Sequence, residues 1–424
     1  MLQIKLKIFH DKLPFSSFLL FLFLFVFIGS EAQNTVSPYS VFGPGEIQNR
    51  GFSSTQGMAG AGIALKSGNS INNLNPASYT GIDSLRIISE FGVAGKVYSL
   101  QSAKEKQNGF TGNLSHVGLG FKYTRWLGGS FGVVPFSTIN YSIVKDNYME
   151  GVNQQYYSGY VGSGGISQLY FGNAVKLGKH LSLGMNFSYM FGSLVQEENI
   201  YATEYVPNMQ VKRYDYMRSL YFDFGTQYAF KKNKIEYSLG LTFAPEQDLR
   251  SKHVIDVYDN TFALVAGDEY NTDYLTVPDI LGVGIGVDNP GKYKFAIDYT
   301  FQNWSAVSYP VQGEDFVNLH RVVAGVEFRP WQYRAVNAAF KNWTYRFGLN
   351  YQRSYLKLGS SAVNDKSITA GFGIPLPGRI SDVNISLTGG INGTTSNNLV
   401  QEKYLIFNIG FNLNEIAFMR RRID

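Results

Sequence analysis

The chain has no cysteine, few charged residues and, beyond its N-terminus, no long apolar run. Only 16% of its 424 residues are charged, against about 25% in an ordinary soluble domain. The absence of cysteine excludes a disulfide framework, a thiolate metal site and a lipoprotein anchor. The net charge of +5 is small and scattered, which argues against a nucleic-acid partner. Glycine (45), tyrosine (29) and phenylalanine (32) are abundant instead, and they favour antiparallel sheet with short turns in contact with an apolar medium.

The first 32 residues predict a secretory signal peptide. Lys5, Lys7 and Lys12 form a basic start, and an apolar run covers 15–28. Small residues, Ser30 and Ala32, stand where a signal peptidase reads, which places cleavage before Gln33. The alternative is a membrane anchor, but a spanning helix needs about 20 apolar residues. No other run is long enough to span as a helix, so a membrane form of the mature chain would be a barrel.

From Ser84 onward the dominant hydrophobic period is two, which predicts strands rather than helices. In the last such stretch, Phe407 belongs to an apolar face and Asn408 to the opposite polar face. Most of these segments are longer than the 5–6 residues of a typical soluble strand, as expected for a membrane crossing of about 9–11 tilted residues. Fourteen are predicted, at 84–97, 112–126, 130–145, 164–178, 180–196, 213–231, 233–246, 277–289, 291–304, 318–329, 341–354, 364–375, 379–391 and 401–413.

The connections alternate between tight turns and long polar loops, which is typical of outer-membrane barrels. The long loops are predicted near 98–111, 146–163, 197–212, 247–276 and 305–317; the connection 330–340 is too long for its turn position and has no explanation. A sandwich would show the same alternation, but strand length, the even count and the export signal favour a barrel. The predicted fold is all-β: a 14-stranded antiparallel transmembrane β-barrel. The predicted domains are signal peptide 1–32, N-terminal hatch 33–83, barrel 84–413 and C-terminal tail 414–424.

Aromatic residues near the predicted strand ends are assigned to girdles at the membrane interfaces. Strand propensity alone is the alternative explanation, because Tyr and Trp favour strands in any case. The loop 247–276 carries apolar residues among acids, which suggests an outer apolar groove. The girdle candidates are Tyr98, Trp126, Tyr141, Tyr170, Trp304, Trp343 and Tyr404; the loop residues are Phe262, Leu264 and Val265.

A stretch rich in Gly and Ala precedes the first strand and ends in Asn75-Pro76-Ala77. Small residues allow close backbone packing, and Pro76 fixes its own φ and removes a donor. The stretch is either a compact segment folded into an interior or an ordinary glycine-rich loop before a sheet. Its small residues include Gly57, Gly60, Gly62 and Ala64.

This block, followed by fourteen strands, resembles the FadL-like family of Gram-negative outer-membrane transporters for fatty acids and aromatic hydrocarbons. The resemblance implies that the N-terminal segment is a hatch in the lumen. It also implies that a hydrophobic ligand enters from outside and leaves sideways at a kink in the third strand. In the sequence that kink falls at Pro135-Phe136, because proline within a strand marks an edge, a bulge or a break. A harmless bulge is the alternative. Arg50 and Lys66 are candidate contacts for a ligand carboxylate.

The function predicted from these features is a channel in the outer membrane of a Gram-negative bacterium for passive uptake of small hydrophobic molecules. A structural or secretion-associated barrel that binds another protein through its loops is the alternative. A barrel hydrolase is disfavoured, because adjacent Ser115 and His116 should face opposite sides of a strand. The five histidines never pair at metal spacing, and no phosphate loop or nucleophile elbow is present. No metal, cofactor or enzymatic activity is therefore expected.

Overall fold

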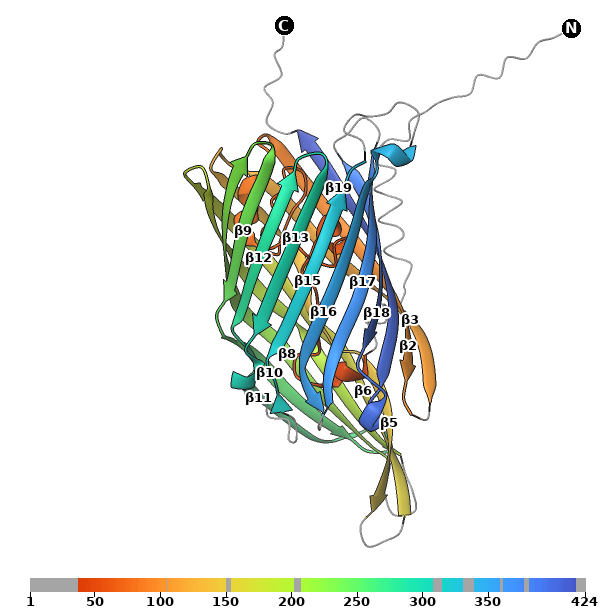
Figure 1. Ribbon diagram of the computed structural model, residues 1–424. Coiled ribbons are helices and arrows are strands. Elements are labelled where there is room, and N and C mark those ends of the chain that lie inside the picture. Colours follow the sequence, from red (N-terminus) through yellow and green to blue (C-terminus); the bar gives the residue numbers. More distant parts are fainter. Residues whose placement is uncertain are drawn as a thin grey trace, which may run out of the picture.

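The computed structural model describes residues 37–103, 105–149, 154–201, 207–307, 315–330, 339–358, 361–376 and 381–416. The predicted signal peptide, most of the connection 330–340 and most of the C-terminal tail lie outside these residues. Among the described residues, no helix is long and apolar enough to cross a membrane. The strands form one tilted antiparallel barrel, and the N-terminal segment, red to orange in Figure 1, lies within it.

The barrel closes because its first strand pairs with its last. β2 (Arg86–Gln101) and β19 (Gln401–Ile416) are antiparallel along their whole length. The other strands are β3 (Lys106–Lys122), β4 (Leu127–Thr138), β5 (Tyr141–Met149), β6 (Gln154–Leu177), β7 (Leu181–Tyr201), β8 (Met209–Lys232), β9 (Ile235–Ala244), β10 (Gln247–Tyr258), β11 (Leu264–Val277), β12 (Ile280–Asn289), β13 (Tyr293–Gln302), β14 (Asp315–Phe316), β15 (Leu319–Phe328), β16 (Thr344–Leu358), β17 (Ser361–Pro375) and β18 (Asp382–Asn392).

The predicted count of fourteen strands is confirmed. Of the elements β2 to β19, four consecutive pairs each continue one another as a single interrupted strand. β4 and β5 both pair with β6, and β9 and β10 both pair with β8. β11 and β12 pair in turn with β10 and β9, and β14 and β15 both pair with β16.

The two rims of the barrel differ in their connections, as expected, and are called the turn end and the loop end. The turn end carries the short turns 123–126, 178–180, 233–234 and 290–292; the opposite rim is the loop end. Much of the predicted loop sequence at the loop end is strand. The predicted loop 247–276 is the hairpin of β10 and β11, and the predicted loop 98–111 is mostly β2 and β3. β19 also continues to Ile416, three residues past the predicted end.

Side-chain facing follows the alternation. Along β7, Leu183 and Phe187 are exposed on the outer surface while Asn186 and Ser188 are buried inside. The lumen is not uniformly polar, however. Phe136, Met190 and other apolar residues of β4 to β12 form a packed cluster on one side of it.

The assignment of aromatic residues to girdles is largely wrong. Trp126 is exposed as predicted, but Tyr98, Tyr141, Tyr170 and Trp304 are buried. Trp343 and Tyr404 are half-buried, and Tyr404 donates to Asp365. Tyr98 and Tyr170 lie in strands and face inward because the parity of each strand decides which side a residue faces. Trp304 lies outside the strands, in η3 (Trp304–Ala306).

Candidate functional site

The N-terminal segment, residues 37–83, consists of short elements joined by turns, with no long helix or strand. It contains η1 (Pro38–Val41), β1 (Glu46–Ile47), α2 (Ser53–Gln56) and η2 (Pro76–Gly81). Its small residues let it follow the inner wall closely. Ala61, Ala64 and Ala77 are fully buried. The stretch after Gly57 is thus packed in an interior and is not an exposed glycine-rich loop.

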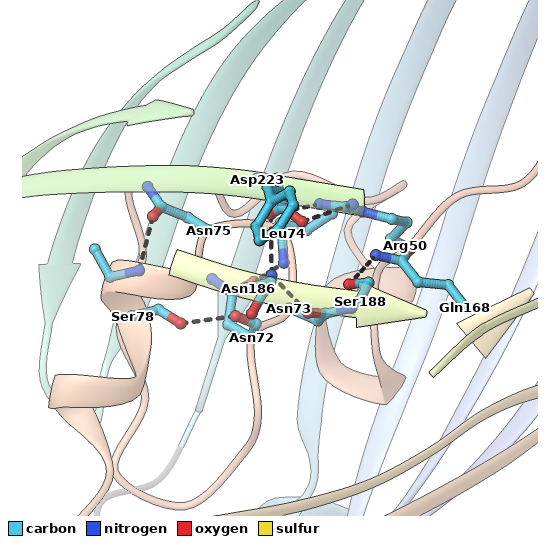
Figure 2. A network of polar contacts seen from close by, with 12 residues as sticks. Arg50, Asn72, Asn73, Leu74, Asn75, Ser78, Gln168, Asn186, Ser188 and Asp223 are labelled. Atoms are coloured by element: carbon cyan, nitrogen blue, oxygen red, sulfur yellow. Dashed lines mark hydrogen bonds and ion pairs between the residues drawn. The ribbon is translucent and has the colours of Figure 1, made fainter. Parts of the chain in front are cut away.

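Asn75 fixes this segment to the wall. Its side-chain oxygen accepts from the backbone N–H of Ala77 at 3.0 Å and caps η2, which begins with Pro76. Its amide nitrogen donates to the carbonyls of Ile63, Thr226 and Leu241 at 2.9, 3.2 and 3.3 Å. One side chain thus joins two parts of the segment to β8 and β9. Figure 2 shows the bond that its side-chain oxygen accepts.

Glycines of the wall make room for the segment. A Cβ on Gly225 would overlap the side chain of Asn75, and one on Gly184 would overlap Pro76 and Ala77. The same holds for Gly240 against Ile63. The wall therefore lacks side chains at the positions where the segment touches it. Further such contacts join Gly118 to Phe52, Gly120 to Ile71, Gly348 to Met58 and Ala59, and Gly410 to Ser53.

The predicted hatch glycines have two different roles. Gly57 lies against Gly371 and the side chain of Arg346, so a side chain there would clash with the wall. Gly60 has φ +85 and touches Asn49, a conformation that favours glycine. Gly62 contacts Thr55 and donates its N–H to Asp298 at 2.6 Å.

Of the two candidate carboxylate contacts, Arg50 is already paired. Its Nη2 lies 3.1 Å from Oδ2 of buried Asp223, which also accepts from Asn186 at 3.0 Å. Figure 2 shows this network between the segment and β7 and β8. Lys66 donates to Ser182 at 2.8 Å and has no ion pair among the described residues. Burial lowers the pKa of Lys66 to about 8.

Pro135 marks the place where the wall opens. β3 and β4 pair only from Val117 opposite Val133 to Lys122 opposite Gly128. Beyond Val133, β4 pairs with β6 through a bulge between Pro135 and Ser137, and the chain leaves the strand at 139–140 before β5 begins. Among the described residues, β3 from 106 to 116 pairs only with β2, and β5 only with β6. We call this interval between β3 and β4/β5 the seam.

The N-terminal segment covers part of the seam from inside. Its β1 pairs with β4, Glu46 opposite Thr138 and Ile47 opposite Ser137. The N–H of Gln48 donates to the carbonyl of Phe136 at 2.9 Å. The phenyl ring of Phe136 itself is buried in the apolar cluster of the lumen. The segment thus supplies β4 with some of the ladder partners that β3 does not.

A cavity of about 610 Å³ lies in the half of the lumen toward the loop end, and it reaches the seam. Leu114, Pro135 and Ser137 line it on the seam side, and Arg321 and Gln352 on the far wall. Its lining is mixed in polarity. Neither Arg50 nor Lys66 contributes to it.

The charges in the cavity are mostly neutralised in pairs. Lys96 lies 2.6 Å from Glu402 and 3.8 Å from Glu46 of β1. Arg321 donates to Asn350 at 2.7 Å and to the carbonyl of Ala59 at 2.9 Å, with no ion pair among the described residues. Sequence reasoning missed these groups. Their signal was a charged residue at an inward-facing position of a strand, as at Lys96 in β2.

A family model described as BamG matches residues 15–424, nearly the whole chain. The chain belongs to the BamG family. This name differs from the FadL-like one that the resemblance suggested, so the predicted family is confirmed only in its fold. No curated protein matches the chain in sequence.

Three solved channels or transporters are similar in structure to this BamG-family chain. The toluene transporter TbuX of Ralstonia pickettii matches with TM-score 0.58 and 13% identity, over 86% of this chain and 99% of that one. The toluene transporter TodX of Pseudomonas putida matches with TM-score 0.55 and 11% identity, over 89% and 100%. The CymD monoaromatic hydrocarbon channel matches with TM-score 0.55 and 14% identity, over 88% and 100%. At such identities the likeness shows a common fold.

In this BamG-family chain, Ser115 and His116 touch, contrary to the prediction. The β2–β3 ladder shifts register where Gly92 opposes His116 and Val93 opposes Leu114, so Ser115 is bulged. Its hydroxyl lies 3.0 Å from His116 Nδ1. His116 Nε2 lies 3.0 Å from the hydroxyl of Ser53 on α2.

The contact between Ser53 and His116 joins the segment to the wall. His116 and Ser53 are both buried, neither lines the cavity, and Phe52 stacks on the imidazole at 4.3 Å. The described residues hold no group of three or more side chains suited to a metal ion.

Proposed function

We propose that this BamG-family protein is an outer-membrane channel for passive uptake of small hydrophobic molecules, fatty-acid-like or hydrocarbon-like. They enter the cavity from the loop end and leave sideways through the seam into the bilayer. The observation that carries this proposal is that the cavity reaches Leu114 and Pro135 where β3 and β4 stop pairing. TodX and TbuX are toluene transporters, and CymD is a monoaromatic hydrocarbon channel. Their similar fold supports the proposal by analogy.

The physics of the seam supports a lateral exit. Unpaired strand edges in a bilayer cost several kcal/mol per backbone group unless something satisfies them, so an open seam facing lipid needs a reason. Pro135 has no N–H to leave unpaired at that edge. An apolar molecule at the seam gains by moving from the mixed lining of the cavity into the acyl chains.

Gating by the N-terminal segment is part of the proposal. A ligand can shift the segment only through contacts that differ between the two positions. The part near the turn end is held by Asn75 and by the wall glycines. The part near the seam is held by the two residue pairs of β1, by side-chain bonds to the wall and by the packing of Tyr39 against Trp304 and Tyr355. This part lines the cavity, where a ligand would contact it, whereas Asn75-Pro76-Ala77 does not. We therefore propose that residues 37–48 move, while Asn75-Pro76-Ala77 stays as the anchor.

For a ligand with a carboxylate, the cavity offers Arg321 in place of the two residues predicted from the sequence. Arg50 is paired with Asp223, and Lys66 lies away from the cavity. Arg321 lines the cavity without an acidic partner among the described residues. We expect Arg321→Gln to weaken uptake of fatty acids and to leave uptake of hydrocarbons unchanged.

A reversible cross-link across the seam tests the exit. Asn113 of β3 and Ser137 of β4 line the cavity on the two sides of the seam, and the chain has no native cysteine. We expect Asn113→Cys with Ser137→Cys to take up a labelled hydrophobic compound when reduced and to lose uptake when oxidised. The single-cysteine variants serve as controls. Full uptake by the oxidised form, with the cross-link shown by mass, would contradict the lateral exit.

A structural barrel that holds another protein through its loops is the second candidate. The hairpin of β10 and β11 favours it, because its tip exposes Phe262, Leu264 and Val265. Phe262 is 78% exposed with φ +60. Purification of the native protein in a mild detergent tests this candidate: a stoichiometric partner that is lost on Phe262→Ser would favour it over transport.

A further inference from the structure

The lumen contains a second space, separate from the cavity at the seam. It is a void of about 30 Å³ toward the turn end, lined by Ser54, Thr55, Lys66, Arg346 and Asn412. Lys294 and Arg329, beside the short turns, also line it. Such a void is large enough for water. Its lining combines polar and charged side chains with Met58 and Leu65, and the lining of the larger cavity is mixed as well.

α2 lies between the two spaces, and the next residues continue the separation, since Met58 lines the void and Ala59 lines the large cavity. Gln56, at the end of α2, lines the large cavity, whereas Ser54 and Thr55 of the same turn line the void. The wall shows the same order. Along β19, Asn408 lines the cavity and Asn412 lines the void. Between them, Gly410 contacts Ser53 of α2.

The two spaces are therefore close to each other along the wall. From Asn408 to Asn412 a strand advances about 13 Å at roughly 3.3 Å per residue. β17 repeats the arrangement, since Thr369 lines the cavity and Gly371, two residues on, touches Gly57 at the end of α2. In both strands a glycine faces the helix, so the wall has no side chain there that would block the route if α2 moved.

Few side-chain bonds hold α2 in place. Gln56 Nε2 donates to the hydroxyl of Ser115 at 2.6 Å, and the hydroxyl of Ser53 lies 3.0 Å from His116. Both wall partners come from the bulge of β3. Ser54, by contrast, contacts Ser70 of its own segment, at 3.5 Å.

We propose that α2 is a septum across an axial aqueous route, and that the barrel passes ions and small hydrophilic solutes when α2 moves. Polar and charged side chains line the spaces on both sides of α2, and they can hydrate such solutes. The proposal is independent of the lateral route, because it uses neither the seam nor Pro135.

Conductance in planar bilayers with potassium chloride tests the septum. We expect Gln56→Ala with Ser115→Ala to raise the frequency of conducting events about five- to tenfold over the unaltered protein, because a hydrogen bond of about 1 kcal/mol is lost. Asn199→Ala with Gln210→Ala, which removes a 2.7 Å hydrogen bond between β7 and β8 at positions that line neither space, is the matched control and should leave the frequency unchanged. Heat-modifiable migration on gels shows whether each variant is folded. Equal conductance of the folded variant with Gln56→Ala and Ser115→Ala and of the unaltered protein would overturn the proposal.

Cysteine labelling gives a second test that needs no weakened α2. Asn408→Cys and Asn412→Cys are made singly in the cysteine-free chain and exposed to a membrane-impermeant thiol reagent from the loop end. We expect Cys at 408 to react at least about tenfold faster than Cys at 412. Adding Gln56→Ala and Ser115→Ala should reduce this ratio. Equal rates in the otherwise unaltered chain, or a ratio that α2 release leaves unchanged in folded protein, would overturn the septum.

Discussion

The side chain of Asn75 occupies the space that a Cβ on Gly225 would need. Asn75 belongs to the N-terminal segment and Gly225 to β8 of the wall, 150 residues later in the chain. The close approach lets the Asn75 amide reach the Thr226 and Leu241 carbonyls on two neighbouring strands. The wall and the segment are therefore shaped to each other, and the segment is part of the folded barrel.

This relationship predicts the effect of a single methyl group. We expect Gly225→Ala to destabilise the folded protein by about 1–3 kcal/mol, because the methyl overpacks the contact with Asn75. Gly389→Ala is the control, since its Cβ would meet only Leu405 at 3.8 Å, an ordinary contact. The midpoint of heat-induced loss of the folded gel band compares the two. Equal midpoints would mean that the segment does not press on this wall.

A substitution can remove the hydrogen bonds that the Asn75 amide donates and keep the capping bond that its side-chain oxygen accepts. Asn75→Asp keeps an oxygen for the N–H of Ala77 but loses the amide that donates to three carbonyls. We expect a loss of about 1–3 kcal/mol for the orphaned groups, and faster proteolysis within the segment. Asn69→Asp is the control, because its side-chain oxygen accepts from Ser67 and keeps that role. Similar proteolysis of the two variants would show that the carbonyl contacts of Asn75 do not hold the segment.

The pair of Arg50 and Asp223 predicts non-additive effects. We expect Asp223→Asn alone to cost about 2–3 kcal/mol, since a mostly buried guanidinium loses its charged acceptor. Arg50→Gln combined with Asp223→Asn should cost less than the sum of the two single changes, by about 0.5–3 kcal/mol. Denaturation midpoints of the four proteins give this coupling energy. Strict additivity would remove Arg50 from its role as a link to the wall.

The facing of β19 predicts opposite tolerances at adjacent positions. Phe407 is exposed on the outer surface, and Asn408 lines the cavity. We expect Phe407→Arg to cost about 2–4 kcal/mol near the bilayer midplane, and Asn408→Arg to cost much less. Refolding into lipid vesicles measures both. A similar cost at the two positions would be inconsistent with lipid outside and water inside.

The sequence was sufficient for the barrel because alternation and short turns are local signals. The fourteen strands follow from period two, and the last strand shows its outward face directly at Phe407. The strand extensions at the loop end were not predicted. Residues 264–271 are exposed on both faces of their strand, so their sequence does not alternate between apolar and polar residues. Tyr170 was placed outside although it shares its parity with buried Gln168.

The candidate site was harder to predict, because its contacts join residues far apart in the chain. Asn75 and Pro135 carry local signals, an N-cap before proline and a proline within a strand. Nothing in the sequence around Arg50 shows that Asp223 neutralises it. The inward turn of Ser115 depends on a bulge that changes strand parity, which no periodicity reveals.

Passage through the seam requires that the cavity opens to the bilayer there. A fluorophore on Asn113→Cys, beside the seam, and one on Gln352→Cys, on the far wall, compare two half-buried positions that both line the cavity. The labelled proteins are reconstituted with lipids that carry a quencher on their acyl chains. If the cavity opens to the bilayer at the seam, we expect strong quenching of the fluorophore at position 113 and little quenching at position 352. Equal quenching at the two positions, or none at 113, would contradict it.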